Sequence, residues 1–158
     1  MPHSGHGDKP WESRHLGEEG RNGTFDGVTP TAETITGVAI SRLGDRLRSL
    51  PASRLSRVDD RLAGQSIAAA SHAFAQWCAW AAAGIGQRQA DTGPEVPGLP
   101  RLDDLASGDQ VQLLGRELIV VLATVEPSTQ VWLAGSRVSA ERVSDELRER
   151  VDGLRSIA

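Results

Sequence analysis

An uncharged stretch constrains the fold of this chain most strongly. It runs from Leu62 to Gln87 and contains no Asp, Glu, Lys or Arg. Its many alanines, with no proline among them, favour an α-helix. A β-strand of this length would be abnormal. We therefore expect one long helix here, around which the rest of the chain packs.

Projection of this helix at about 100° per residue gives two apolar faces and one narrow polar strip. The first apolar face is formed by Ile67, Phe74, Cys78, Ala81 and Ile85. The second is formed by Ala73, Trp77, Trp80 and Gly84. The polar strip is formed by Gln65, His72 and Gln76. Two apolar faces are typical of a central helix with several packing partners.

The same stretch exceeds the roughly 20 residues that span a bilayer. However, the glutamines and the histidine of the polar strip would be costly in hydrocarbon. Trp77 and Trp80 also lie in the middle of the segment, where no membrane interface would lie. We predict no membrane insertion.

Length and composition indicate one globular domain. The chain has 158 residues and a formal net charge of -4, which makes a nucleic-acid partner the weaker expectation. Its single cysteine, Cys78, excludes an intramolecular disulfide. The first residues contain no apolar segment of a secretory signal, so we expect a cytoplasmic protein.

The N-terminal part differs from the rest. Residues 1–28 are rich in Gly, Glu, Arg and His, and we expect a flexible tail before a single helical domain at 29–158. The apolar exceptions are Trp11, Leu16 and Phe25, which suit either a docking motif or an arm that folds back. We take Trp11 as a candidate partner contact. The tail histidines do not form a convincing metal site, and we expect no metal.

The first helix is expected to begin at Thr29 as N-cap with Pro30 after it. Its apolar stripe is Ile35, Ala39, Leu43, Leu47 and Leu50. Pro51 interrupts this pattern, and helical spacing resumes from Ser53. Two alternatives fit the join to the uncharged stretch: a continuous helix, or a bend near Gly64.

The segment 89–100 contains three prolines and two glycines and is expected to be a loop. Ser107 and Gln110 then resemble a capping box that opens a helix as far as about Val125. A β-hairpin at about 117–134 is the alternative, because this region is dense in β-branched residues. Even with a helix, Gln130 to Leu133 suit an extended segment.

The last helix is expected to start after Ser139. Its narrow apolar seam is Val143, Leu147, Val151 and Leu154. Its other faces are charged, as in the outer helix of a bundle or half of a coiled-coil contact. The fold class that follows is an all-α bundle of four to five helices around the long Ala-rich helix, with a small C-terminal hairpin as the alternative.

The sequence indicates three candidate sites, but no residue pattern in it indicates a particular chemical reaction. The polar strip of Gln65, His72 and Gln76 could line a ligand pocket. An anion or nucleic-acid surface could be formed by Arg42, Arg46, Arg54, Arg57 and Arg61. The seam of the last helix could contact a partner. Cys78 and His72 point about 120° apart on one helix and cannot form a catalytic dyad.

The leading hypothesis is a non-enzymatic interaction or regulatory module that acts through helical surfaces on another protein or on a second copy. The second hypothesis is a small-ligand sensor or enzyme with its pocket at the polar strip. The third is an arginine-mediated nucleic-acid binder. No motif indicates a cofactor.

Overall fold

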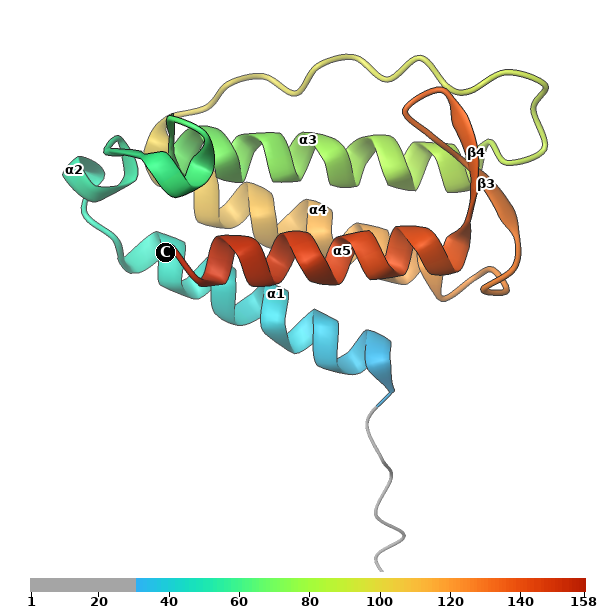
Figure 1. Ribbon diagram of the computed structural model, residues 1–158, viewed down its shortest axis with the longest axis horizontal. Coiled ribbons are helices and arrows are strands. Elements are labelled where there is room, and N and C mark those ends of the chain that lie inside the picture. Colours follow the sequence, from blue (N-terminus) through green and yellow to red (C-terminus); the bar gives the residue numbers. More distant parts are fainter. Residues whose placement is uncertain (1–30) are drawn as a thin grey trace, which may run out of the picture.

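The computed structural model describes residues 31–158, in which four long helices form a bundle joined partly by two short antiparallel hairpins (Figure 1). The long helices are α1 (Ala32–Ser49), α3 (Ile67–Gly86), α4 (Ser107–Leu122) and α5 (Ala140–Arg155). The short elements are α2 (Ala52–Leu55), β1 (Val58–Asp59), the 3-10 turn η1 (Asp60–Leu62), β2 (Gln65–Ser66), the 3-10 turn η2 (Asp104–Ala106), β3 (Gln130–Leu133) and β4 (Ser136–Ser139). The predicted helical bundle is confirmed, with a small C-terminal hairpin. The predicted tail and Trp11 lie outside the described residues.

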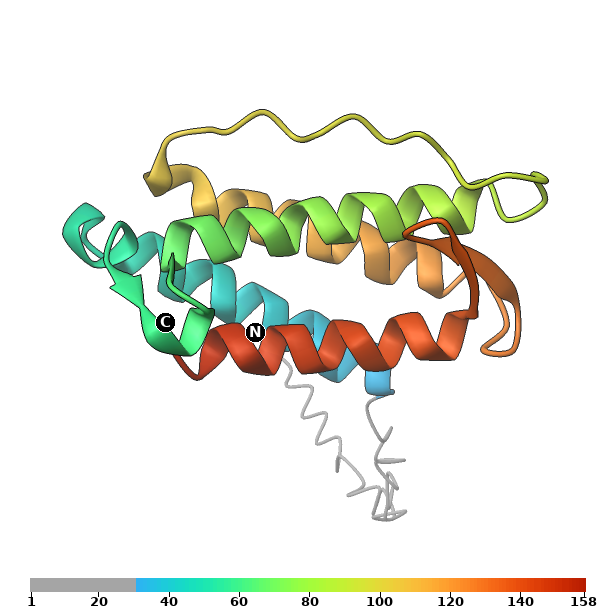
Figure 2. The same cartoon turned by 45° about the horizontal axis from the view of Figure 1, so that its top comes forward.

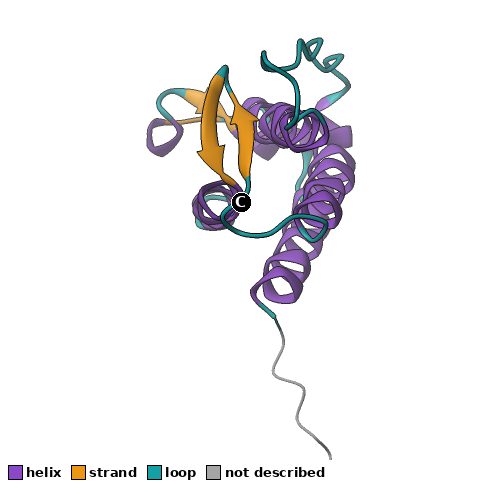
Figure 3. Cartoon of the chain, turned by 90° about the vertical axis from the view of Figure 1, so that its right-hand side faces the viewer, coloured by secondary structure: helices purple, strands orange, loops and turns teal. Residues whose placement is uncertain are grey.

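The long helices enclose one core. The uncharged helix α3 packs against α4, α5 and β3, whereas α1 packs mainly against α4 and α5. Figure 3 shows the hairpin of β3 and β4 at one end of the helices. Helices α3 and α4 run in one direction and α1 and α5 in the other (Figures 1 and 2). Fully buried side chains come from all four helices and include Ile40, Leu43, Leu47, Ile85, Val111, Leu118, Val143, Leu147 and Val151.

Helix α1 starts later than the sequence predicts. Its N-cap is Thr31, whose side chain accepts a hydrogen bond from the backbone N–H of Thr34 at 3.2 Å. The predicted stripe is also partly wrong, because Ile35 is 57% exposed whereas Ile40, outside that stripe, is fully buried. The face that enters the core is set by the packing of α4 and α5 against α1, which the spacing of apolar residues does not specify.

The join between α2 and α3 is neither a continuous helix nor a simple bend. Strands β1 and β2 pair Val58 with Ser66 and enclose η1, and the chain turns back through Ala63 and Gly64 at φ of 54° and 75°. These left-handed conformations end any helix. Ser66 then caps α3 by accepting from the N–H of Ala69, so α3 starts five residues after Leu62.

Two further predictions for the C-terminal half need correction. Ser107 is not an N-cap: it lies inside α4 and its hydroxyl donates to the Asp104 carbonyl at 2.6 Å. The hairpin lies at 130–139 rather than at 117–134, which leaves the helix prediction correct as far as Leu122. The predicted extended segment Gln130–Leu133 is confirmed as β3, and Ser139 caps α5 as expected.

A long loop, residues 87–103, runs along the outside of α3 and returns the chain to the end at which α3 began (Figures 1 and 2). We call it the strap. The parallel course of α3 and α4 requires such a return. The strap is fixed at its start by Trp132, whose indole N–H donates to the Ala90 carbonyl at 3.1 Å. Within the described part of the chain, no helix has the length and hydrophobicity needed to cross a bilayer.

Candidate functional site

One residue of the polar strip, Gln76, contacts the strap. Gln65 lies outside α3, exposed in β2. The side-chain oxygen of Gln76 accepts the backbone N–H of Leu99 in the strap, and His72 Nδ1 lies 3.4 Å from Gln110 Oε1. The three predicted residues therefore do not come together, and the cavities described below are lined by other side chains. The structure gives the pocket hypothesis no support at this place.

The five predicted arginines line two separate hollows, and Arg42 also lines a third, which is described below. Arg54, Arg57 and Arg61 line one of them, together with Asp59 and Asp60. The second hollow is lined by Arg42, Leu43, Arg46, Asp152, Arg155 and Ser156. Each hollow therefore mixes acidic with basic groups, and the arginines do not form one continuous cationic surface.

Asp59 is the best-defined charged group of the first hollow. Arg61 binds its carboxylate with two side-chain contacts, at 3.0 Å from Nε and 2.7 Å from Nη2. The Arg61 backbone N–H donates to the same carboxylate at 2.9 Å. These hydrogen bonds, the side-chain ones first, lower the pKa of Asp59 to about 2. Arg61 is thus engaged inside its own turn.

The seam of α5 is not available to a partner in this fold. All four of its residues are buried in the core of the chain, with Val143, Leu147 and Val151 almost completely inaccessible. Of the two predicted roles, the outer helix of a bundle fits, because the seam packs against α1 and α3 of the same chain. A surface for a partner must therefore be sought elsewhere.

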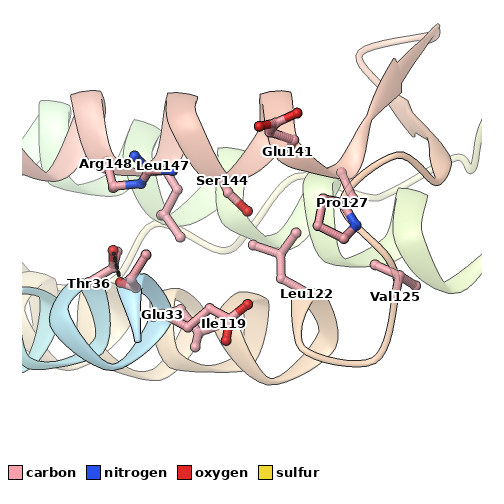
Figure 4. Close-up of a pocket in the computed structure, with 12 residues that line it drawn as sticks. Glu33, Thr36, Ile119, Leu122, Val125, Pro127, Glu141, Ser144, Leu147 and Arg148 are labelled. Carbon is pink, nitrogen blue, oxygen red and sulfur yellow. Dashed lines mark hydrogen bonds between the residues drawn. The ribbon is translucent and has the colours of Figure 1, made fainter. Parts of the chain in front are cut away.

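A cavity of about 200 Å³ lies where α1 begins, α4 ends and α5 begins (Figure 4). Its apolar lining is Ala32, Ile119, Leu122, Val125, Pro127, Ala140 and Leu147. Its polar lining is Glu33, Thr36, Glu141, Ser144 and Arg148. Arg148 is already paired with Asp145 at 2.7 Å, whereas Glu33 and Glu141 form no ion pair within residues 31–158.

A shallower hollow adjoins this cavity on the outer side of α1 and α4, and the two share Glu33 and Ile119. We call its exposed part the α1/α4 face: Glu33, Thr34, Val38, Arg42, Arg116 and Val120. Val38 is 46% exposed and Val120 66%. Leu113, 70% exposed, lies seven residues before Val120 and hence on the same side of α4.

Glycines make this face continuous. A Cβ on Gly108 would lie 2.6 Å from the Gly44 carbonyl oxygen, and one on Gly115 would lie 2.9 Å from Ile40 Cγ2. The backbones of α1 and α4 therefore approach closely, with little side-chain volume between them. The outer sides of the two helices form a single surface with valines in its middle.

Comparison of the chain with protein-family models, curated proteins and solved structures found no match. The function must be argued from the site itself.

The α1/α4 face offers apolar contact area and fixed charges. The nucleophilic side chain that the sequence singled out, Cys78, is fully buried in the hydrophobic core, and burial raises the pKa of its thiol. Sequence reasoning missed the face because it followed the core stripe of α4. The available signal was the second apolar pair, Leu113 and Val120, two turns apart and off that stripe.

Proposed function

We propose that the chain is a non-enzymatic helical module that binds a protein partner through the α1/α4 face. The observation that carries this proposal is the exposure of Val38, Leu113 and Val120 on the outer sides of two adjacent helices. Large exposed apolar side chains that gather on one surface are typical of protein contact sites. The charged rim of Glu33, Arg42 and Arg116 suits the polar border of such a contact.

The adjoining cavity is small for a ligand site, and the hollow on the face itself, of about 470 Å³, is shallower. The cavity's volume of about 200 Å³ lies below the roughly 300–1,000 Å³ of usual ligand pockets. A cavity of this size suits one anchoring side chain of a partner. The expected cytoplasmic location and a regulatory role remain part of this proposal.

Site-specific photo-crosslinking tests the proposal. A photoreactive phenylalanine analogue at Val120 in the full chain is expected to yield a protein adduct in cells that produce the protein natively. The same analogue at Glu149, exposed on α5, is the control and is expected to yield none. Absence of an adduct from Val120, or equal adducts from both positions, would contradict the proposed function.

A further inference from the structure

We propose that the cavity at the start of α1 is filled by the side chain of Phe25, from the segment of this chain that precedes α1. The inference goes beyond the proposed function and does not rest on it, because it concerns the cavity and not the α1/α4 face. Phe25 lies outside the described residues. The size and lining of the cavity, and the place where the chain enters α1, carry the argument.

The cavity has the size and the apolar lining of a site for a phenyl ring. Its volume is about 200 Å³, and Ile119, Leu122 and Leu147 are among its lining residues. Leu122 of α4 and Leu147 of α5 point toward each other across it (Figure 4). An apolar cavity of about 150 Å³ engineered in another protein binds benzene. The larger volume here therefore accommodates a phenyl ring together with its methylene group.

The chain enters the bundle beside this cavity. Thr31 is the N-cap of α1, and the next two residues, Ala32 and Glu33, both line the cavity. Phe25 precedes Thr31 by six residues, which span at most about 20 Å. The pair Asp26-Gly27, directly after Phe25, favours a turn that reverses the chain. A side chain tethered so closely has an effective concentration in the millimolar range.

Phe25 suits the cavity better than the other apolar side chains of the N-terminal part. Trp11 and Leu16 lie 20 and 15 residues before Thr31, and the longer loop that each must close costs more entropy. Val28 is closer to α1, but its side chain is smaller than a phenyl ring and fills less of the cavity. The sequence therefore provides one aromatic ring within a short tether of the cavity.

The α1/α4 face remains open when Phe25 fills the cavity. Val38, Leu113 and Val120 lie on the outer sides of α1 and α4 and are absent from the cavity lining. A partner can therefore contact the face while Phe25 is in place. A partner whose anchoring side chain enters the cavity must first displace Phe25.

Fluorine NMR of the full chain tests the inference. The chain contains two phenylalanines, Phe25 and Phe74, so labelling with para-fluorophenylalanine should give two resonances. Phe74 is 3% exposed and reports whether the core is folded, and Phe74→Leu assigns its resonance. The Phe25 resonance should be displaced from its position in denaturant, and it should be protected from a soluble paramagnetic agent.

A blocking variant identifies the cavity as the site. Ser144 lines the cavity from α5, so Ser144→Trp should fill it and return the Phe25 resonance to its position in denaturant. The Phe74 resonance should stay in place, which shows that the variant is folded. Glu149→Trp, exposed on the same helix, is the matched control and should leave both resonances unchanged.

Thermal unfolding gives a readout that does not need the blocking variant. Phe25→Ala should lower the Tm by about 5 °C, because the cavity loses its occupant. Trp11→Ala is the control and should leave the Tm unchanged. The inference is overturned by a wild-type Phe25 resonance at its position in denaturant, by a displaced resonance that folded Ser144→Trp does not move, or by an unchanged Tm for Phe25→Ala. Each of these results leaves the proposed function in place, because that function depends on the adduct from Val120.

Discussion

Single residues in this protein are constrained most strongly where backbones meet. Gly84 in α3 faces the backbone of β3, and a Cβ there would lie 1.8 Å from the Trp132 carbonyl oxygen. Gly86, two residues later in the same helix, has nothing within 4 Å of the corresponding position. These glycines look alike in sequence, and only the position of the hairpin distinguishes them.

Gly84→Ala should therefore destabilise the protein by about 1–3 kcal/mol or more, because the hairpin must move away from α3. Gly86→Ala should be neutral or stabilising by up to about 1 kcal/mol, since alanine favours helix. Urea unfolding of both variants measures the difference. Equal free energies of unfolding would show that β3 does not pack on α3 as described.

Asp59 makes the stability of the turn between α2 and α3 depend on pH. Its pKa is about 2 in the folded chain, below the ordinary value. A lowered pKa contributes stability that is present above the unfolded pKa, about 3.9, and is lost as the pH falls through the folded value. This contribution to stability is therefore lost between about pH 4 and about pH 2.

Asp59→Asn should lower the Tm at pH 7, and the difference from wild type should shrink as the pH is lowered toward 2. Asp60→Asn is the control, because the Asp60 side chain is exposed and forms no hydrogen bond within residues 31–158. Thermal unfolding across this pH range is the measurement. A Tm difference that stays constant with pH would contradict the role given to the Asp59 carboxylate.

At the scale of elements, both hairpins turn through an alanine followed by a glycine. Ala63–Gly64 and Ala134–Gly135 each have positive φ at both positions, and each pair follows a leucine. The second pair closes β3 onto β4 with a two-residue turn, a geometry that favours Asn-Gly. Alanine is an unusual residue for this conformation, which explains why the turn is difficult to predict from the sequence.

Ala134→Asn should stabilise the protein by roughly 0.5–1 kcal/mol, because asparagine tolerates positive φ better than alanine. Ala134→Val should destabilise it, since a β-branched residue is strained at φ of 48°. The sign of the change in Tm distinguishes the two. The same sign for both would show that the turn does not have this conformation.

At the scale of the whole molecule, the core ties all four long helices into one unit, with Cys78 fully buried in it. The guanidinium of Arg150 from α5 lies 4.7 Å from the centre of the Trp77 ring of α3 and covers this part of the core. The Cys78 thiol should react only when the bundle opens as a whole. Its reactivity is therefore a probe of global unfolding.

Iodoacetamide should label Cys78 at least about a thousandfold more slowly in buffer than in denaturant, as expected for a domain of ordinary stability. The matched control is Cys78→Ala combined with Glu149→Cys, which places the thiol on the exposed side of α5 and should label at once. Mass spectrometry follows both reactions. Rapid labelling of native Cys78 would show that the core opens locally.

The local signals in the sequence were sufficient for the four long helices, the long loop after α3, the cap at Ser139 and the burial of Cys78. Each of these depends on neighbours within a few residues: alanine content, prolines, a serine before a periodic apolar run. A bend near Gly64 was one of two predicted alternatives, whereas the turn at Ala134 was not predicted, because alanine normally favours helix. The strand pairing of each hairpin holds its alanine in a left-handed conformation instead.

The candidate surface was decided by tertiary structure. Amphipathic spacing shows that the α5 seam must be covered, but it does not say whether the cover is α1 and α3 of the same chain or a partner. Likewise, exposure of Val38 and Val120 depends on which sides of α1 and α4 face each other, and the close approach at Gly44 and Gly108 fixes that choice. The sequence alone determined which segments are helices and how apolar each is. Only the packing of the helices determined which apolar residues remain outside, because burial is a property of pairs of surfaces.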